Sequence, residues 1–253
     1  DSNFEPLALE LYFGEGGQAP ALSIGEDEER IELVGVVDRI DGWKKDDKLY
    51  IRVVDYKSGY KKFDLGDIWH GLNLQMFLYL FALEKIGKDI FGTETVGAGV
   101  LYVPVKDTVY SGSRGEDDEK IQKMIDESLR RSGLILRENE VVEAMESGNP
   151  KRFIPVSYAR DGLAYTKRSS LANLEQLGKL KKHIEMLLRQ MSRALHQGEI
   201  KADPYYRNSR NNACQYCDFL TACRFDKTNG KDQMRYLYSV KADDFWNRVG
   251  GDE

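Results

Sequence analysis

The sequence has few cysteines and histidines and lacks any long apolar run. Its three cysteines all lie between positions 214 and 223, which excludes a secreted disulfide scaffold and predicts a reducing, cytoplasmic setting. The longest apolar stretch, LQMFLYLFAL, is about half a membrane span and contains a glutamine, so we expect no transmembrane helix and no membrane partner. With only six prolines and no long polar tract, extended disorder is not expected either.

Basic residues are not in excess, since 42 acidic side chains oppose 37 basic ones and the net charge is −5. Any contact with nucleic acid must therefore use local patches rather than the field of the whole protein. Two short basic stretches are candidates, although a solvated helix face is the commoner explanation of the second. They are Tyr60, Lys61 and Lys62, and the run KLKKH at 179–183 with Arg189 and Arg193.

The hydrophobic pattern predicts an α/β fold, with a mixed central sheet flanked by helices. Buried strands are expected at 31–40, 49–57 and 96–105, the first two forming a hairpin through a turn at 41–48. Residues 1–30 are mixed in character, 111–120 indicate a loop and 148–168 an irregular segment. The expected helices are 67–85, a segment that stops near Gly133, 139–147, and a long amphipathic helix at 169–197.

The chain begins with DSNF, without a methionine, which predicts an N-terminally truncated fragment. Residues 1–227 are expected to form one domain. Residues 228–253 are polar with a few aromatics, and we expect them to form a tail packed on the surface of that domain.

Charged residues end the two strands of the predicted hairpin. Side chains alternate along a strand, so Asp55 and Lys57 extend an otherwise apolar face, and Asp38 is the one charge on its face of the partner strand. Two neighbouring buried carboxylates repel unless a cation lies between them. Mg²⁺ prefers such oxygen ligands, and a lysine beside it can hold an attacking water or a phosphoryl oxygen. The pattern therefore predicts phosphodiester hydrolysis.

Two alternatives compete with this interpretation. Asp55 and Lys57 could form an ordinary surface ion pair at a strand end. Asp41 competes with Asp38 as a ligand, but it lies in a predicted Asp-Gly turn and on the opposite face, so Asp38 is preferred.

The motifs GVVDRID and VVDYKSG resemble the D…D-x-K core of the PD-(D/E)xK nucleases, specifically their RecB-like branch. The resemblance implies a restriction-endonuclease-like core and a Mg²⁺ or Mn²⁺ site. It assigns Asp38, Asp55 and the main-chain carbonyl of Tyr56 as metal ligands and Lys57 as a catalytic residue.

The helix expected after this motif contains NLQMFLYL, in which Gln75 and Tyr79 are four residues apart and share a face. Gln75 interrupts an apolar run, and a buried amide requires a partner, so a core hydrogen bond is the simpler explanation. In RecB-like nucleases, however, a Q-x-x-x-Y motif follows the D-x-K strand and lies next to the active centre. The resemblance therefore adds Gln75 and Tyr79 to the catalytic set.

The cysteines Cys214, Cys217 and Cys223 have the spacing C-x2-C-x5-C, one ligand short of a closed zinc site. His183 or His196 could supply the fourth ligand or be solvated, and the three thiols could instead pack in the core. The resemblance implies a third option, a [4Fe-4S] cluster that these cysteines hold together with one further cysteine upstream. This chain has no upstream cysteine and lacks the upstream histidine of the family's metal site; His70 is not assigned to that role.

The resemblance extends over most of the chain, through LALELYFG, RRSGLILRENEVVEAMES, RFIPV and GEIKADPYY with the cysteine segment. These segments are similar to the nuclease domains of AddB-type helicase–nuclease subunits, which process broken DNA ends for recombinational repair. The resemblance implies exonuclease action on a single DNA strand and an AddA-like partner subunit. Two interpretations from other classes are a non-catalytic module that binds DNA ends or a partner protein, and a zinc-binding interaction domain.

Overall fold

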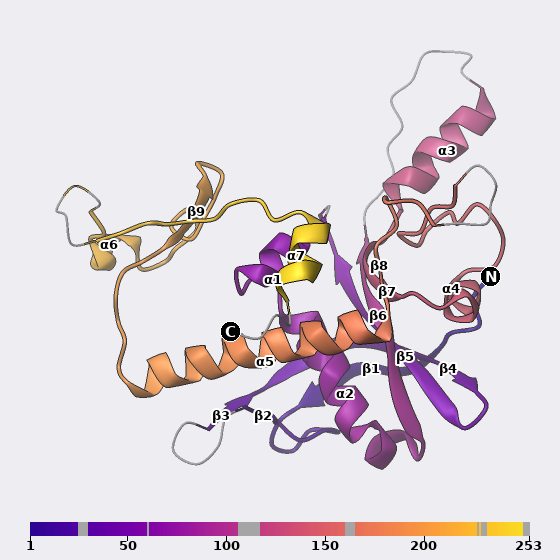
Figure 1. Cartoon of the computed structure of the whole chain (residues 1–253), viewed down its shortest axis with the longest axis horizontal. Helices are drawn as coiled ribbons and strands as arrows, with labels where there is room; N and C mark the ends of the chain where they lie inside the picture. The colour runs from indigo at the N-terminus through magenta and orange to yellow at the C-terminus, as the bar shows by residue number, and fades with distance from the viewer. Residues whose placement is uncertain are drawn as a thin grey trace.

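The computed structural model of the chain describes residues 1–24, 30–59, 61–105, 117–159, 165–226, 228 and 232–249. A six-stranded sheet with the order β1-β4-β5-β6-β7-β8 forms its centre (Figure 1). The β5–β6 and β7–β8 pairs are parallel and the other pairs antiparallel, so the predicted mixed α/β architecture is confirmed. The strands are β1 (Glu5–Phe13), β4 (Gly35–Lys45), β5 (Lys48–Lys57), β6 (Glu94–Pro104), β7 (Ser132–Leu136) and β8 (Leu171–Ala172).

The predicted hairpin is present, but its turn is much tighter than expected. Strands β4 and β5 pair from Arg39 opposite Val54 to Lys45 opposite Lys48, which leaves a two-residue turn at Asp46 and Asp47. The prediction of a turn over 41–48 was wrong because its polar residues continue the strand on alternating faces.

The expected helix at 67–85 is two helices, α1 (Leu65–Trp69) and α2 (Gln75–Phe91). Between them the backbone takes positive φ values at Gly71 (77°) and Asn73 (56°), which ends the first helix. Asn73 donates a hydrogen bond to Asp67 Oδ2 at 2.7 Å. Helix α2 packs on β5 and β6, and its apolar residues, including Leu80 and Leu83, are fully buried.

The long amphipathic helix is α5 (Leu174–His196), which packs on α2. It begins at 174 rather than 169 because Asn173 forms a reciprocal capping box with Gln176. Helix α4 (Asn139–Met145) agrees with the prediction for 139–147. The helix expected to stop near Gly133 is α3 (Asp118–Ser128) and ends earlier, because residues 132–136 join the sheet as β7.

The stretch 1–30 contains strands that its mixed composition did not reveal: β1, and β2 (Leu22–Ile24), which pairs with β3 (Ile31–Leu33). Beyond α5 the chain forms a small sheet of β9 (Tyr205–Asn208), β10 (Asn211–Asn212) and β11 (Arg235–Tyr236). This region carries the short helix α6 (Leu220–Cys223) and projects away from the central sheet (Figure 1). In the described part of the chain, no helix has the length and apolarity to cross a membrane.

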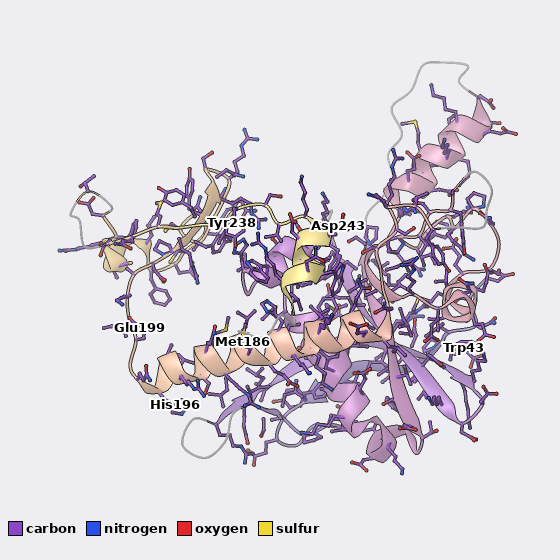
Figure 2. All side chains as sticks on the ribbon, in the orientation of Figure 1. Trp43, Met186, His196, Glu199, Tyr238 and Asp243 are labelled. Carbon is purple, nitrogen blue, oxygen red and sulfur yellow. The ribbon has the colours of Figure 1, made fainter. Side chains whose placement is uncertain are left out.

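The C-terminal segment returns to the main body and packs against α1 through α7 (Ala242–Arg248). Phe245 on α7 is fully buried and lies 6.3 Å from the Trp69 ring. Tyr238, labelled in Figure 2 on the segment before α7, accepts a hydrogen bond from Trp69 Nε1 at 3.0 Å. The segment therefore contributes to the core, beyond the surface packing expected for a polar tail.

Candidate active site

Asp38 and Asp55 lie side by side on β4 and β5. The register places Arg39 opposite Val54, so the next pair outward along the hairpin is Asp38 and Asp55, which share a face of the sheet. The Asp38 carboxylate accepts a hydrogen bond from the backbone N–H of Tyr56 at 3.0 Å. This bond orients the first acid toward the D-x-K segment.

Asp55 has an unsatisfied carboxylate oxygen. Its Oδ2 atom is buried and receives no hydrogen bond of acceptable geometry from the described residues, although Lys57 Nζ lies 2.6 Å away. The two observations agree if the ammonium provides charge at close range but no aligned N–H. The Asp55 side chain is 15% exposed and that of Lys57 39%, so the lysine leads from this acid to solvent.

A divalent cation fits these donors. Mg²⁺ usually binds through one or two carboxylates and keeps several waters, and Asp38, Asp55 and the carbonyl of Tyr56 provide such oxygens. Among the described residues, no group of three His, Cys, Asp or Glu side chains is placed to hold a metal. Water or substrate oxygens would therefore have to complete the coordination.

Tyr102 extends the row of polar side chains to the third strand. It is the register partner of Asp55 in the parallel β5–β6 pair and is 6% exposed. Burial, followed by the charges of Asp55 and Asp67, raises the pKa of Tyr102 to about 12, so its phenol stays protonated at neutral pH. Sequence analysis missed this residue; its signal was a polar-tipped side chain close to the end of a predicted core strand.

Gln75 is exposed at the start of α2, so the expectation of a buried amide was wrong. Its Nε2 donates to Tyr79 Oη at 3.0 Å. Tyr79 is buried and stacks on Phe13 at 5.5 Å. A Cβ at Gly35 would clash with the Tyr79 hydroxyl, so only glycine fits at the start of β4. The structure therefore brings this pair to the strand of Asp38, three residues from it.

Asp41, the competing candidate, lies inside β4 rather than in a turn, and it is fully buried. Its carboxylate binds Arg39 Nε at 2.5 Å and Arg52 Nε at 2.9 Å. Successive strand residues alternate between faces, so Asp41 faces away from Asp38. Two guanidinium groups neutralise Asp41, which leaves it poorly suited to bind a metal.

The three cysteines are free thiols. Cys214 is half-buried and Cys217 and Cys223 are exposed, so the alternative that they pack in the core was wrong. His183 is buried, stacked on Trp69 at 5.2 Å; burial lowers its pKa. With no three-residue metal group among the described residues, the cysteine segment by itself does not fit a closed metal site.

The predicted basic stretches are only partly free for DNA. Tyr60 lies outside the described residues, and Lys61 donates to Asn73 Oδ1 at 2.7 Å. In the 179–183 run, Lys179 pairs with Glu175 at 2.8 Å and Lys181 lies over the Phe81 ring at 5.7 Å. Much of this helix face therefore serves packing and local ion pairing.

The sheet and the D…D-x-K arrangement agree with a comparison to protein families, in which the model of the PD-(D/E)XK nuclease superfamily matches residues 1–224. The chain belongs to this superfamily.

More narrowly, the chain is similar to part of proteins that are named as one of the subunits of an ATP-dependent helicase/deoxyribonuclease. It is 35% identical to the one from Acetivibrio thermocellus over 255 aligned positions, covering 100% of this chain and 22% of the relative. The relatives from Clostridium kluyveri (33%, 97% of this chain, 22% of the relative) and Clostridium acetobutylicum (34%, 98%, 21%) give the same picture. The chain thus spans about a fifth of the length of the relatives it matches.

Proposed function

We propose that this chain cleaves DNA phosphodiester bonds with the help of a divalent cation. The observation that carries the proposal is the buried Oδ2 of Asp55, which lacks a hydrogen bond from the described residues and has the Lys57 ammonium at 2.6 Å. An unsatisfied carboxylate oxygen is costly in a purely structural role. Superfamily membership supports the same interpretation.

Each residue has a role that follows from its position. Asp38, fixed by the Tyr56 N–H, and Asp55 would hold Mg²⁺ or Mn²⁺ together with the Tyr56 carbonyl. When bound, the ion supplies a water of lowered pKa and stabilises charge on the phosphoryl oxygen. Lys57, half-exposed beside Asp55, donates to the attacking water or to a phosphoryl oxygen. Gln75 and Tyr79 would position the start of β4 and, through it, Asp38.

The natural substrate is proposed to be a single DNA strand from a broken end. The name of the similar proteins, which contains both helicase and deoxyribonuclease, supports this. Exonuclease action beside an AddA-like partner subunit, in recombinational repair, completes the proposal. Free thiols are compatible with work in the cytoplasm. We further propose residues 1–227 as the nuclease domain and 228–253 as a tail packed on it, which the burial of Phe245 supports.

The activity is tested with end-labelled single-stranded DNA. We expect cleavage with Mg²⁺ or Mn²⁺ and none in EDTA. Lys57→Ala should lower the rate about 10²-fold or more, because it removes a charged donor to the transition state. Lys48→Ala is the matched control, since Lys48 is an exposed lysine at the other end of the same strand.

Full activity of Lys57→Ala, or cleavage without metal, would contradict the proposed mechanism. Strand binding without any cleavage would instead favour the non-catalytic binding module.

A second metal centre is proposed for the cysteines. Cys214, Cys217 and Cys223 would give three of the four thiolates of a [4Fe-4S] cluster, the fourth coming from outside these 253 residues. Metal analysis after anaerobic reconstitution of the chain tests this. Iron with an equal amount of acid-labile sulfide is the expected result, whereas zinc near one per chain would support the zinc-binding interaction domain.

A further inference from the structure

A cationic pocket lies at the end of the sheet where the site residues are. Its volume is about 380 Å³, and its lining includes four cations and one carboxylate. Their charges sum to +3, on a chain whose net charge is −5. The charged lining residues are Lys62, Arg130, Arg131, Arg168 and Glu127.

The cations of this pocket are not neutralised by ion pairs. Among the described residues, none of the four has a carboxylate within salt-bridge distance. The carboxylates whose charges act on Arg131 are Glu146 and Asp41. Glu146 accepts hydrogen bonds from the backbone N–H groups of residues 152–154, and Asp41 binds two other arginines. Within the described part of the chain, Arg131 therefore lacks a counterion of its own.

Arg130 is anchored but keeps donors available. One of its terminal nitrogens donates to the Val156 carbonyl at 2.8 Å and to Ser157 Oγ at 3.2 Å. A guanidinium has five N–H donors, so the others can meet a ligand in the pocket. Fixed guanidinium groups of this kind suit phosphate oxygens, which accept from two N–H groups at once.

The register of the sheet connects the pocket to Asp55. Asp55 pairs with Tyr102, and Tyr102 pairs with Ser132, which lines the pocket. Directly paired residues point to the same face, so the three side chains form a row across β5, β6 and β7 (Figure 1). With about 4.8 Å between strands, Ser132 lies about 10 Å from Asp55, or about three nucleotides of B-form rise.

We infer that this pocket binds the backbone phosphates of a single DNA strand a few nucleotides away from the scissile bond. The inference rests on the proposed nuclease function and adds a binding site to it. A strand held at the pocket and at the two acids would be fixed at two points along its length, which limits its sliding during cleavage.

Binding of a fluorescein-labelled single strand of about 20 nucleotides in EDTA tests the inference without cleavage. The double variant Lys62→Gln/Arg168→Gln changes two exposed side chains, so it should fold normally. It should bind about tenfold more weakly at low salt. The slope of log K against log salt should fall by about 1.4, since each phosphate contact on a single strand contributes about 0.7.

Lys44→Gln/Lys48→Gln is the matched control, because it removes the same charge at the far, turn end of the hairpin. We expect its affinity and salt slope to stay close to those of the unchanged chain. Equal losses in the two double variants would overturn the inference, and so would no binding by the unchanged chain. Displacement of the strand by equimolar thymidine monophosphate would indicate a free-nucleotide site and overturn it as well.

The result is independent of the nuclease proposal. If the pocket variant loses affinity and the unchanged chain cleaves nothing with Mg²⁺ or Mn²⁺, the pocket inference stands and the nuclease proposal fails. If the chain cleaves DNA but the pocket variant binds normally, the nuclease proposal stands and the pocket inference fails.

Discussion

Asp55→Asn should abolish cleavage while leaving the protein as stable as before, or more stable. The substitution keeps the shape of the side chain and removes the charge that would bind a metal. Metal ions contribute several kcal/mol to transition-state stabilisation, and each step of about 1.4 kcal/mol is tenfold in rate, so we expect a loss of about 10³-fold or more. Cleavage of end-labelled single-stranded DNA with Mg²⁺ measures it.

The stability measurement makes this prediction specific. Asp55 Oδ2 is buried without a hydrogen bond from the described residues, so an uncharged amide should be tolerated there. We expect the urea midpoint without metal to stay constant or rise, which is the usual relation at sites that store strain for function.

Asp47→Asn is the control for Asp55→Asn, since it makes the same chemical change at an exposed turn of the same hairpin. It should leave both the cleavage rate and the urea midpoint unchanged. Normal cleavage by Asp55→Asn would remove this residue from the proposed mechanism. A large loss of stability would show that Lys57 depends on Asp55 structurally.

Local period-2 patterning was enough to predict the hairpin acids. Alternation along the strands placed Asp38 and Asp55 on the inner face and Asp41 on the other, and the register of β4 and β5 agrees. The turn was placed wrongly because Asp41 and Gly42 look like a turn in isolation. In the folded chain, Arg39 and Arg52 neutralise Asp41, so strand pairing outweighs the local preference.

Contacts between distant segments could not be predicted in this way. Tyr102 belongs to the row of site side chains only because β6 is parallel to β5. Strand β7, which brings Ser132 beside Tyr102, has five residues and no clear alternation. The break between α1 and α2 depends on Asn73, which adopts a positive φ and bonds Asp67. Its helical neighbours concealed this break in the sequence.

Asp41→Ala should have the opposite effect to Asp55→Asn, with a large loss of stability and little change in specific activity. Asp41 is fully buried between Arg39 and Arg52, and Arg52 is 4% exposed. Removing one partner of a buried ion pair leaves an uncompensated charge and costs about 3–5 kcal/mol. At about 2–4 °C per kcal/mol for a chain of this size, the melting temperature should fall by about 10 °C.

A double variant identifies the cause of that loss. Asp41→Leu/Arg52→Leu removes both buried charges, and such replacements are often neutral or stabilising. It should therefore be more stable than Asp41→Leu alone, by an interaction energy of about 1–3 kcal/mol in a double-mutant cycle. Arg52 supports this expectation, because burial lowers its pKa and its Nη1 atom is buried without a partner among the described residues.

Activity per folded molecule then separates the two faces of β4. Asp41 and Asp38 are three residues apart but point to opposite sides of the sheet. Asp41→Ala, assayed well below its melting temperature, should therefore cleave DNA at nearly the rate of the unchanged chain. Cleavage lost in proportion to Asp55→Asn would mean that Asp41 contributes to the metal site. In that case Arg39 and Arg52 would have to release the Asp41 carboxylate when metal binds, and the two faces of β4 would not act independently.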